Sequence, residues 1–594
     1  ALPFAWRHVE LEPWQEKARC QLMRILVRTE QRDEALQQYH DLEDELGSAL
    51  HIKPGKNIRE LYKTIKSGNH ISLSDKPSKV RLEEPLTPPK FLKENRPNMS
   101  PPHETFVARK EELDRLHTHL DAAISGRGCV VMVAGETGSG KSVLVREFIQ
   151  QAQSRFPDLI SAVGYSNAFT GVGDPYLPFR EILYQLSGDI SGRYKAGILS
   201  QQNALNLWHN VPKTCQALLT YGPDLIDNLL PGETILAFTS PYAETSPHWY
   251  RELQKHIEEK RHQPAEFIQQ ANLFSQFTNV FQKISEHVPL LLFIDDLQWA
   301  DGGSISILFQ FLKQIKHHQI LLIGAFRSDE VGLKLGDKVH PLIPVLHEIQ
   351  REFGDVLINL GSTSGRDFIQ ALIASEPNAL QEDFQEQLYL LTGGNALFTI
   401  ETLRSLRESG ALVRDGRGIW VLRSDLNIES LPPRAEGIIA ARISRLPQRL
   451  QRILTLASIE GEVFTAEIIA LLAGLPVDEV ISLLSDVLGK QHRLVQPQQI
   501  IRKGNQTIST YRFRHFLFQN YLYSTLDKIQ RCRLHGQVGC EMERIAGDNT
   551  ADYAVHLARH FKKANQAEKA SYYYSLAGQR AVSMSAYPEA IKQY

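Results

Sequence analysis

One stretch of eight residues constrains the fold more than any other, GETGSGKS at 135–142. It lies between the apolar run CVVMVA and the segment VLVREFIQ, which has helical periodicity, so we expect a strand before it and a helix after it. The spacing G-x-x-x-x-G-K-S is that of a phosphate-binding loop (P-loop). Its glycines let backbone N–H groups converge on phosphate oxygens at the positive end of the following helix. The stretch therefore predicts a site for a nucleotide phosphate.

Within this loop, each residue type suits a particular task. Lys141 is expected to contact the β- and γ-phosphates, and Ser142 to offer its hydroxyl to Mg²⁺. A glycine turn without function is the alternative, but the full match and its strand–helix context argue against it. The residues expected to bind the nucleotide here are Gly135, Glu136, Thr137, Gly138, Ser139, Gly140, Lys141, Ser142 and Val143.

A second group of polar residues follows two other apolar runs. In LLLFIDDLQWAD, Asp295 is the expected magnesium partner through water, and Asp296 the group that orients an attacking water. Arg327 ends the run ILLIGAFR and is placed to sense a γ-phosphate by charge-assisted hydrogen bonds. The alternatives are that the aspartates cap the next helix and that Arg327 is a surface residue. The predicted catalytic set is Lys141, Asp295, Asp296 and Arg327, with Ser142 and Asp295 as the metal pair.

The fold class follows from five apolar, β-branched runs that alternate with helical segments. These runs are CVVMVAG, LISAVGYS, PLLLFIDD, QILLIGAFR and DVLINLGS. Strands that are apolar throughout are buried on both faces of a sheet, which is typical of a parallel α/β arrangement. We therefore predict a multidomain α/β plus α protein with a parallel-sheet P-loop NTPase core. Residues 170–265 are irregular and are assigned only as a partly helical insertion.

The remaining sequence divides into segments that differ in composition and hydrophobic periodicity. Several domains are expected, because a chain of 594 residues is too long for a single core. Helical periodicity between residues 12 and 66 places Trp14, Leu22, Ile25 and Leu26 near one face and predicts a helical hairpin. Three helices and a hairpin near the C-terminal third predict a winged helix. The expected domains are 1–69 helical, 70–104 a Pro-rich linker, 105–362 the ATPase, 363–430 a helical lid, 431–525 the winged helix, and 526–594 helical repeats.

An internal echo supports the assignment of repeats at both ends. EALQQY at 34–39 returns as EAIKQY at 589–594, and AEKASYYY at 567–574 is a looser copy. Small alanines and a tyrosine at this spacing are typical of the second helix of tetratricopeptide (TPR) units. Chance similarity among amphipathic helices is the alternative. Because the last copy stops at residue 594, we expect a longer natural chain.

Charge, apolar runs and cysteine spacing indicate where in the cell the protein is located. The formal charge of −2 gives no global attraction to nucleic acid or anionic membrane. No apolar run approaches the roughly 20 residues that cross a bilayer, and the first residues lack a signal pattern. Five scattered cysteines without zinc or disulfide spacing predict reduced thiols and a cytoplasmic protein: Cys20, Cys129, Cys215, Cys532 and Cys540.

The order of motifs resembles one known family. FVARKEELDRL, GETGSGKS, FIDDLQWAD, GAFRSDE, LTGGNALF and YRFRHFLFQNYLY are similar to the STAND class, signal-transducing P-loop ATPases with numerous domains, over residues 105–594. EPWQEKARCQLMRIL, EALQQY and ELYKTIKSG, within residues 12–69, resemble the C-terminal part of a bacterial transcriptional activator domain. Full versions of that domain usually follow a DNA-binding winged helix, so we expect DNA contact only through a module outside this sequence.

The resemblance implies further nucleotide contacts. Phe106, Val107 and Arg109 should help bind the base, and Ala108 stands where the family usually has glycine, a departure we expect to be tolerated. Adenine is favoured over guanine because the sequence has no N-K-x-D motif. His515, in FRHF, matches a winged-helix histidine that contacts the β-phosphate of ADP, although a packed core histidine is as good an interpretation.

The lid motif departs from the family pattern. The family has G-G-N-P, whose proline touches the nucleotide, whereas this sequence has Gly393, Gly394, Asn395 and Ala396. The proline contact is therefore in question.

The resemblance implies an ATP/ADP switch with Mg²⁺, slow hydrolysis, and protein partners or self-assembly through the repeats. We expect a regulator of transcription. The alternative is a defence or scaffold ATPase that binds protein partners without DNA. A phosphotransferase is a third, weaker reading, since no acceptor site follows the P-loop. The basic segment KIQRCRLHG at 528–536 is a candidate for DNA phosphates or an ordinary solvated helix face.

Overall fold

The computed structural model describes residues 19–20, 22–23, 26–27, 31–49, 56–66, 106–166, 174–243, 247–261, 269–332, 340–361, 365–423, 435–503 and 506–594. The chain divides into two compact units, Ala1–Pro85 and Leu86–Tyr594, and each is described by itself. The predicted linker and the predicted apolar residues Trp14 and Ile25 lie outside the described residues.

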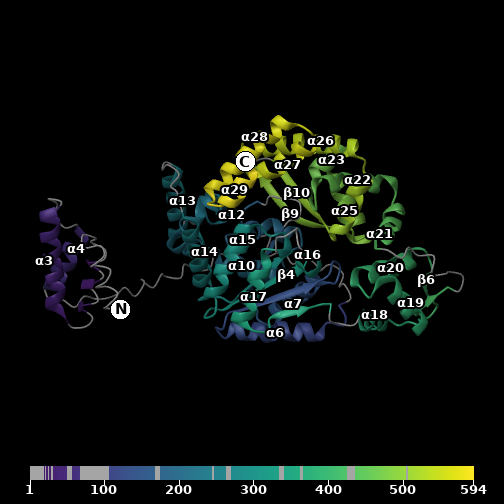
Figure 1. Cartoon of the computed structure of the whole chain (residues 1–594), viewed down its shortest axis with the longest axis horizontal. Helices are drawn as coiled ribbons and strands as arrows, with labels where there is room; N and C mark the ends of the chain where they lie inside the picture. Colours follow the sequence, from purple (N-terminus) through teal and green to yellow (C-terminus); the bar gives the residue numbers. More distant parts are fainter. Residues whose placement is uncertain are drawn as a thin grey trace. The chain divides into compact units, whose positions relative to one another are not determined.

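The first unit is helical, as its periodicity predicts. Helices α3 (Arg32–Ala49) and α4 (Lys56–Lys66) pack together (Figure 1). The Tyr39 ring stacks on the Tyr62 ring at 4.2 Å between centroids. Leu22 and Leu26 are fully buried in the same small core, which confirms two of the four residues assigned to the apolar face.

The second unit is built around a five-stranded parallel sheet in the order β2-β3-β4-β1-β5. Every residue of β3 and β4 is buried, because neither strand has a polar residue before its last position. All five strands fall where the apolar runs predict them. They are β1 (Cys129–Gly135), β2 (Ile160–Tyr165), β3 (Leu290–Asp295), β4 (Ile320–Arg327) and β5 (Leu357–Asn359).

Helices cover both faces of this sheet, which gives three layers (Figure 1). One face packs on α6 and α7, and the other on the helices of the insertion with α14, α15 and α17. Alternate strand residues, such as Val131 and Val130 of β1, enter the two different cores. The bounds are α6 (Lys110–Ile124), α7 (Lys141–Arg155), α14 (Gln270–Ser285), α15 (Gly302–Gln314), α16 (Ser328–Gly332) and α17 (Leu342–Phe353).

Residues 170–265 are more regular than predicted. Their helices share the large core of the ATPase sheet, where the Trp208 ring stacks on Tyr242 at 4.5 Å. The helical period was hard to see because most helices are short and the longest contains Pro212. The elements are α8 (Leu177–Leu186), α9 (Ser191–Lys195), α10 (Gln201–Tyr221), α11 (Leu225–Asn228), α12 (Gly232–Thr239) and α13 (His248–Arg261).

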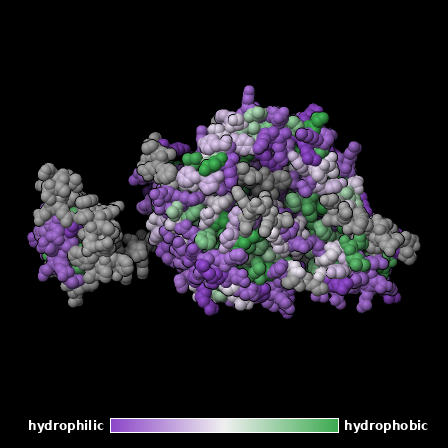
Figure 2. Space-filling view, viewed as in Figure 1, coloured by the Kyte–Doolittle hydropathy of each residue, from purple (hydrophilic) through white to green (hydrophobic). Residues whose placement is uncertain are grey.

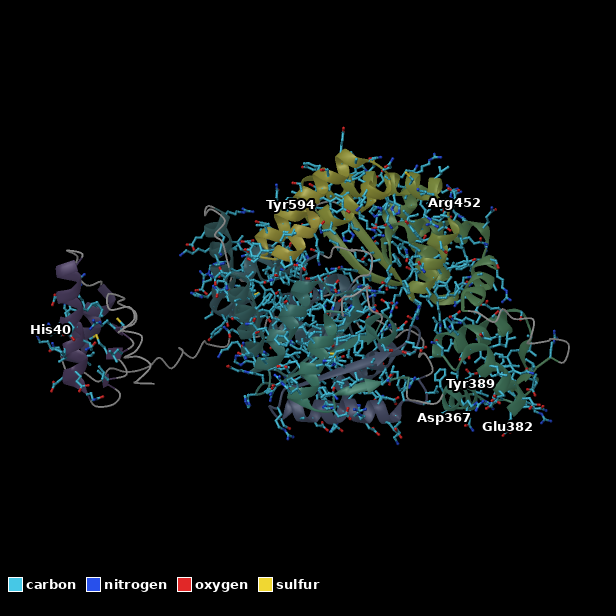
Figure 3. All side chains as sticks on the ribbon, in the orientation of Figure 1. His40, Asp367, Glu382, Tyr389, Arg452 and Tyr594 are labelled. Atoms are coloured by element: carbon cyan, nitrogen blue, oxygen red, sulfur yellow. The ribbon has the colours of Figure 1, made fainter. Side chains whose placement is uncertain are left out.

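A smaller helical region with its own core follows the ATPase sheet, at the place predicted for the lid. Phe368, Phe384 and Leu406 form part of that core. Outward-facing side chains of these helices, including Asp367 and Glu382, are labelled in Figure 3. The elements are α18 (Gly365–Ala374), α19 (Glu382–Thr392), α20 (Ala396–Glu408) and the hairpin β6 (Leu412–Arg414) with β7 (Trp420–Leu422).

The next region has the helix, strand, helix, helix, hairpin order of a winged helix. Its antiparallel sheet has the order β8-β10-β9. We call the hairpin of β9 and β10 the wing. The elements are α21 (Ala435–Ser444), α22 (Gln448–Glu460), β8 (Val463–Thr465), α23 (Ala466–Ala473), α24 (Val477–Ser482), a π-helix η5 (Leu483–Gln491), β9 (Val495–Lys503), β10 (Gln506–Phe513) and α25 (Phe516–Thr525).

Helices at the C-terminal end pack in sequence order, each on the next, as stacked repeats do. Helix α29 also lies against α15 of the ATPase (Figure 1). The elements are α26 (Lys528–Ala546), α27 (Ala554–Lys563), α28 (Ala567–Ser583) and α29 (Tyr587–Gln593). Hydrophilic residues cover most of the described surface seen in Figure 2, with small hydrophobic areas between them.

Within the described ranges, no single helix is long and apolar enough to span a membrane, although α23 and α24–η5, bent by 117°, pass that test as a pair.

Candidate functional site

The P-loop lies between β1 and α7, as its sequence predicts. Gly138 and Gly140 have left-handed φ values of 80° and 95°, which turn the chain sharply before the helix begins at Lys141. Lys141 Nζ donates to the carbonyl oxygens of Gly135 and Glu136, both at 2.9 Å. Burial lowers the pKa of Lys141. The loop thus holds a buried cation at a helix N-terminus, where a phosphate group would be stabilised.

The predicted metal pair is brought together across the sheet. Ser142 Oγ donates to Asp295 Oδ2 at 2.6 Å. Burial and the neighbouring Asp296 raise the pKa of Asp295. The protein therefore does not supply enough positive charge and hydrogen bonds to offset the cost of burying this carboxylate in its charged form. A hydroxyl beside such a carboxylate suits Mg²⁺, which takes one or two protein ligands and completes its shell with water and phosphate oxygens. The donor set therefore fits the ion.

Asp296 and Arg327 also meet. Arg327 Nη2 lies 3.4 Å from Asp296 Oδ1, and Nη1 donates to Glu330 at 2.7 Å. The guanidinium lies between two aromatic rings, 4.2 Å from the centroid of Trp299 and 4.5 Å from that of Phe516. Arg327 is buried, so the alternative of a surface arginine is wrong. The residues predicted for catalysis thus share one place.

These residues line a cavity of about 740 Å³ that opens between the P-loop, the lid and the winged helix. That volume lies in the range of small-molecule sites. Basic side chains outnumber acidic ones, which suits a polyanion such as a nucleoside triphosphate. The basic lining residues are Lys141, Arg146, Arg327, Arg404, Arg407, Lys490, Arg493, Arg512 and Arg514, and the acidic ones are Asp295, Asp296, Glu376, Glu401 and Glu462.

The lid motif touches the P-loop directly. Asn395 Nδ2 donates to the carbonyl of Thr137 at 2.8 Å, and the Leu397 N–H donates to that of Gly138 at 3.0 Å. A Cβ atom on Gly138 would come within 2.7 Å of Asn395 Oδ1, so only glycine permits this approach. Ala396 lines the cavity in place of the family's proline. The lid therefore closes on the phosphate loop through Asn395 and backbone groups.

The contact of His515 with the β-phosphate of ADP stays a prediction, and the residue itself is half-buried and lines the cavity. Its Nδ1 accepts from the Leu517 N–H at 3.5 Å and so caps α25. Burial lowers the pKa of His515 to about 3, and the charges of Arg327 and Lys141 act in the same direction. A neutral ring with Nδ1 as acceptor carries its proton on Nε2, which can donate to a phosphate oxygen.

Three residues predicted to bind the base do not reach the cavity. Phe106 packs against the sheet core, and Val107 packs against the lid core. Arg109 Nη1 donates to Glu112 at 2.9 Å and to the carbonyl of Leu360 at 3.3 Å. Their contact with adenine stays a prediction. Of the P-loop residues, Gly135, Glu136 and Ser139 are also absent from the cavity lining.

The replacement of glycine by Ala108 has a structural cost. Ala108 has a φ of 58°, in the left-handed region that glycine enters without strain. For a residue with a Cβ atom this conformation costs about 1 to 2 kcal/mol. The departure is thus accommodated, but with backbone strain where the chain enters the ATPase.

The sequence analysis did not predict that residues of the winged helix line the cavity, and the most important of them is Arg512. Its side chain lies between Glu462 and Asp296. A signal was present, because Tyr511 and Phe513 are buried in the winged-helix core, and alternation along β10 turns Arg512 to the opposite face. That face lines the cavity.

The wing also docks on the insertion, whose role the sequence did not reveal. Gln499 Nε2 of β9 lies 2.9 Å from both carboxylate oxygens of Asp189. Arg193 Nε donates to the same carboxylate at 2.9 Å. Gly192 lies so close to the carbonyl of Ile500 that a Cβ atom there would be 2.2 Å from the oxygen. The insertion therefore forms a docking surface for the wing at Asp189 and Gly192.

Two protein families match parts of the chain. Residues 105–323 match the AAA ATPase domain family, and residues 1–66 match the bacterial transcriptional activator domain family. An uncharacterized protein of Rhizobium meliloti is 22% identical over 485 residues, a match that covers 82% of this chain and 42% of that protein. The chain thus spans less than half the length of this relative.

Two solved structures are also similar. One is a signal transduction ATPase with numerous domains (STAND) with a tetratricopeptide repeat sensor from Pyrococcus horikoshii, at 13% identity and a TM-score of 0.39, covering 83% of this chain and 58% of that one. The other is Drosophila ORC bound to DNA, at 12% identity and a TM-score of 0.27, covering 71% and 88%. By its family matches, the chain carries an AAA ATPase domain at residues 105–323 and a bacterial transcriptional activator domain at residues 1–66.

Proposed function

We propose that this protein is a cytoplasmic, ATP-dependent switch that regulates transcription. The observation that carries the proposal is the cavity, because the P-loop, the lid and the winged helix all line it. A nucleotide bound there would contact all three at once. Its γ-phosphate could therefore favour one arrangement of these parts over another.

Each site residue has a task in this proposal. Lys141 binds the β- and γ-phosphates, and Ser142 with Asp295 would hold Mg²⁺, which neutralises phosphate charge when bound. Asp296 accepts a hydrogen bond from the attacking water and orients it. As the water oxygen bonds to the γ-phosphorus, the bond from that phosphorus to the bridging oxygen breaks. ADP leaves with the bridging oxygen, and the two protons of the water leave on the phosphate as H₂PO₄⁻. Arg327 senses the γ-phosphate, and His515 the β-phosphate of ADP.

The energy required is within reach of these contacts. Shifting a two-state equilibrium from 1:99 to 99:1 takes about 5.5 kcal/mol of differential binding. A hydrogen bond to a charged group contributes about 1.5 to 3 kcal/mol. Contacts of the γ-phosphate with Lys141, Arg327 and Mg²⁺ could together supply that difference. Slow hydrolysis would reset the switch.

The activator domain supports a role in transcription, with DNA bound by a module outside this sequence. The repeats would bind protein partners or further copies of the chain. Among the described residues, Cys129, Cys215, Cys532 and Cys540 are free thiols, which supports the proposed cytoplasmic setting.

One observation favours the alternative of a scaffold or defence ATPase that binds only protein. Lys490 and Gln491 lie at the end of η5, which continues α24 as the helix directly before the wing, and both residues line the cavity. The helix that would enter a DNA groove therefore ends at the nucleotide site instead. In the basic segment, Arg531 donates to the carbonyl of Ser524 at 2.8 Å and packs on the Tyr523 ring. That arrangement is typical of an ordinary helix face.

Substitution of Lys141 tests ATP binding. We expect Lys141→Ala to weaken ATP affinity by about tenfold to hundredfold, because a charged hydrogen bond to phosphate is lost. Isothermal titration calorimetry with ATP and Mg²⁺ measures this, and circular dichroism checks the fold. Lys255→Ala is the matched control, since Lys255 is 76% exposed on α13. Wild-type affinity in Lys141→Ala would refute the proposed function.

A further inference from the structure

The winged helix reaches the phosphate site through one enclosed arginine. Arg512 lies next to the end of β10, and its side chain is only 9% exposed. Its guanidinium carbon is 4.3 Å from the centroid of the Tyr165 ring, at the end of β2. A cation and an aromatic ring at this distance attract each other more strongly when both are desolvated. The winged helix and the ATPase sheet therefore meet at this residue.

An acid of the winged helix fixes the direction of the guanidinium. Arg512 Nε donates to Glu462 Oε1 at 2.8 Å, and Nη2 lies 2.7 Å from the same oxygen. Glu462 is itself buried, and burial raises its pKa. A planar guanidinium held by two of its nitrogens has little freedom to turn. One of these two nitrogens, Nη2, also faces the ATPase.

The group of the ATPase that Nη2 faces is Asp296. Arg512 Nη2 lies 3.6 Å from Asp296 Oδ2. The other oxygen, Oδ1, accepts from Gln298 Nε2 at 2.8 Å and lies 3.4 Å from Arg327 Nη2. Both oxygens of the carboxylate thus face donors, one supplied by the ATPase and the other by the winged helix. A carboxylate that orients a water must offer that water an oxygen within hydrogen-bond reach.

We propose that Arg512 is a positioning residue through which the docked winged helix suppresses ATP hydrolysis. While β10 stays in place, Arg512 holds Asp296 Oδ2 away from the attacking water. Movement of the winged helix withdraws Arg512, and Oδ2 becomes available. The inference rests on the proposed function, because it assigns the control of hydrolysis at the same site.

Kinetics of the full chain test the inference. Arg512→Met keeps the length of the side chain and removes its charge, so kcat should rise by about tenfold while KM for ATP changes by less than about twofold. Arg512→Lys keeps the charge without the planar fork and should restore part of the suppression. Arg452→Met is the matched control, because Arg452 is exposed on α22 of the same region (Figure 3). Its kcat should equal that of the wild type.

A second measurement does not depend on turnover. Hydrogen–deuterium exchange of β10, without nucleotide, should increase in Arg512→Met and in Asp296→Asn, since each removes one partner of the contact. The double variant should exchange no faster than either single variant, because the two residues act as one unit. Additive increases would mean that Arg512 only stabilises the winged helix, and would overturn the inference.

The outcomes separate the inference from the proposed function. If wild type binds ATP, Lys141→Ala binds it more weakly, and kcat of Arg512→Met is unchanged or lower, only the inference is wrong. If wild type fails to bind ATP, the proposed function is wrong and the inference falls with it.

Discussion

At the scale of single residues, Asp296, which lines the cavity, and Ala108, which does not, both have left-handed backbone conformations. Ala108, at the entry to the ATPase domain, has a φ of 58°, and Asp296, after β3, has a φ of 56°. Such conformations persist only where the surroundings hold them, and they cluster at functional sites. Asp296 has a reason to be there, since the turn aims its carboxylate at Arg327 and Arg512. Ala108 has no polar side chain to aim.

Ala108→Gly should therefore stabilise the protein. Glycine removes about 1 to 2 kcal/mol of left-handed strain but adds some entropy to the unfolded chain, so we expect a net gain of about 0.5 to 1 kcal/mol. Urea unfolding followed by circular dichroism measures it. Ala122→Gly, in α6, is the matched control and should lose about 1 kcal/mol instead. A loss of stability in Ala108→Gly would show that the alanine methyl contributes packing that outweighs the strain.

At the scale of elements, the wing is held at two separate places. Arg512 of β10 reaches Asp296 of the ATPase site, and Gln499 of β9 reaches Asp189 of the insertion. At the second place the backbones of Gly192 and Ile500 nearly touch. The insertion thus contacts the hairpin whose other strand carries Arg512.

The variant Gly192→Ala tests this contact between the insertion and the wing. The new methyl group would lie 2.2 Å from the carbonyl oxygen of Ile500, so β9 must move away. We expect faster hydrogen–deuterium exchange in β9, with helices α10 and α14 unaffected. Gly416→Ala is the control, because nothing lies within 4 Å of a Cβ atom there. Unchanged exchange in β9 would mean that the wing does not depend on α9.

At the scale of the whole molecule, the sequence predicts the ATPase sheet well, and it also predicts which polar residues meet at the end of its strands. Five apolar runs gave five parallel strands, and Lys141, Ser142, Asp295, Asp296 and Arg327 meet because parallel strands present their ends at one edge. Partners from distant regions were not predictable. The contacts of Arg512 with Glu462 and Asp296 depend on how the winged helix docks, and no local pattern encodes that.

The central claim is that nucleotide state controls how the winged helix sits on the ATPase. Hydrogen–deuterium exchange of β9 and β10 should be compared in the wild-type chain loaded with ADP and with a non-hydrolysable ATP analogue. We predict faster exchange of both strands with the ATP analogue, because γ-phosphate contacts compete with the docked arrangement. Equal exchange in the two states, with both nucleotides bound, would contradict the account.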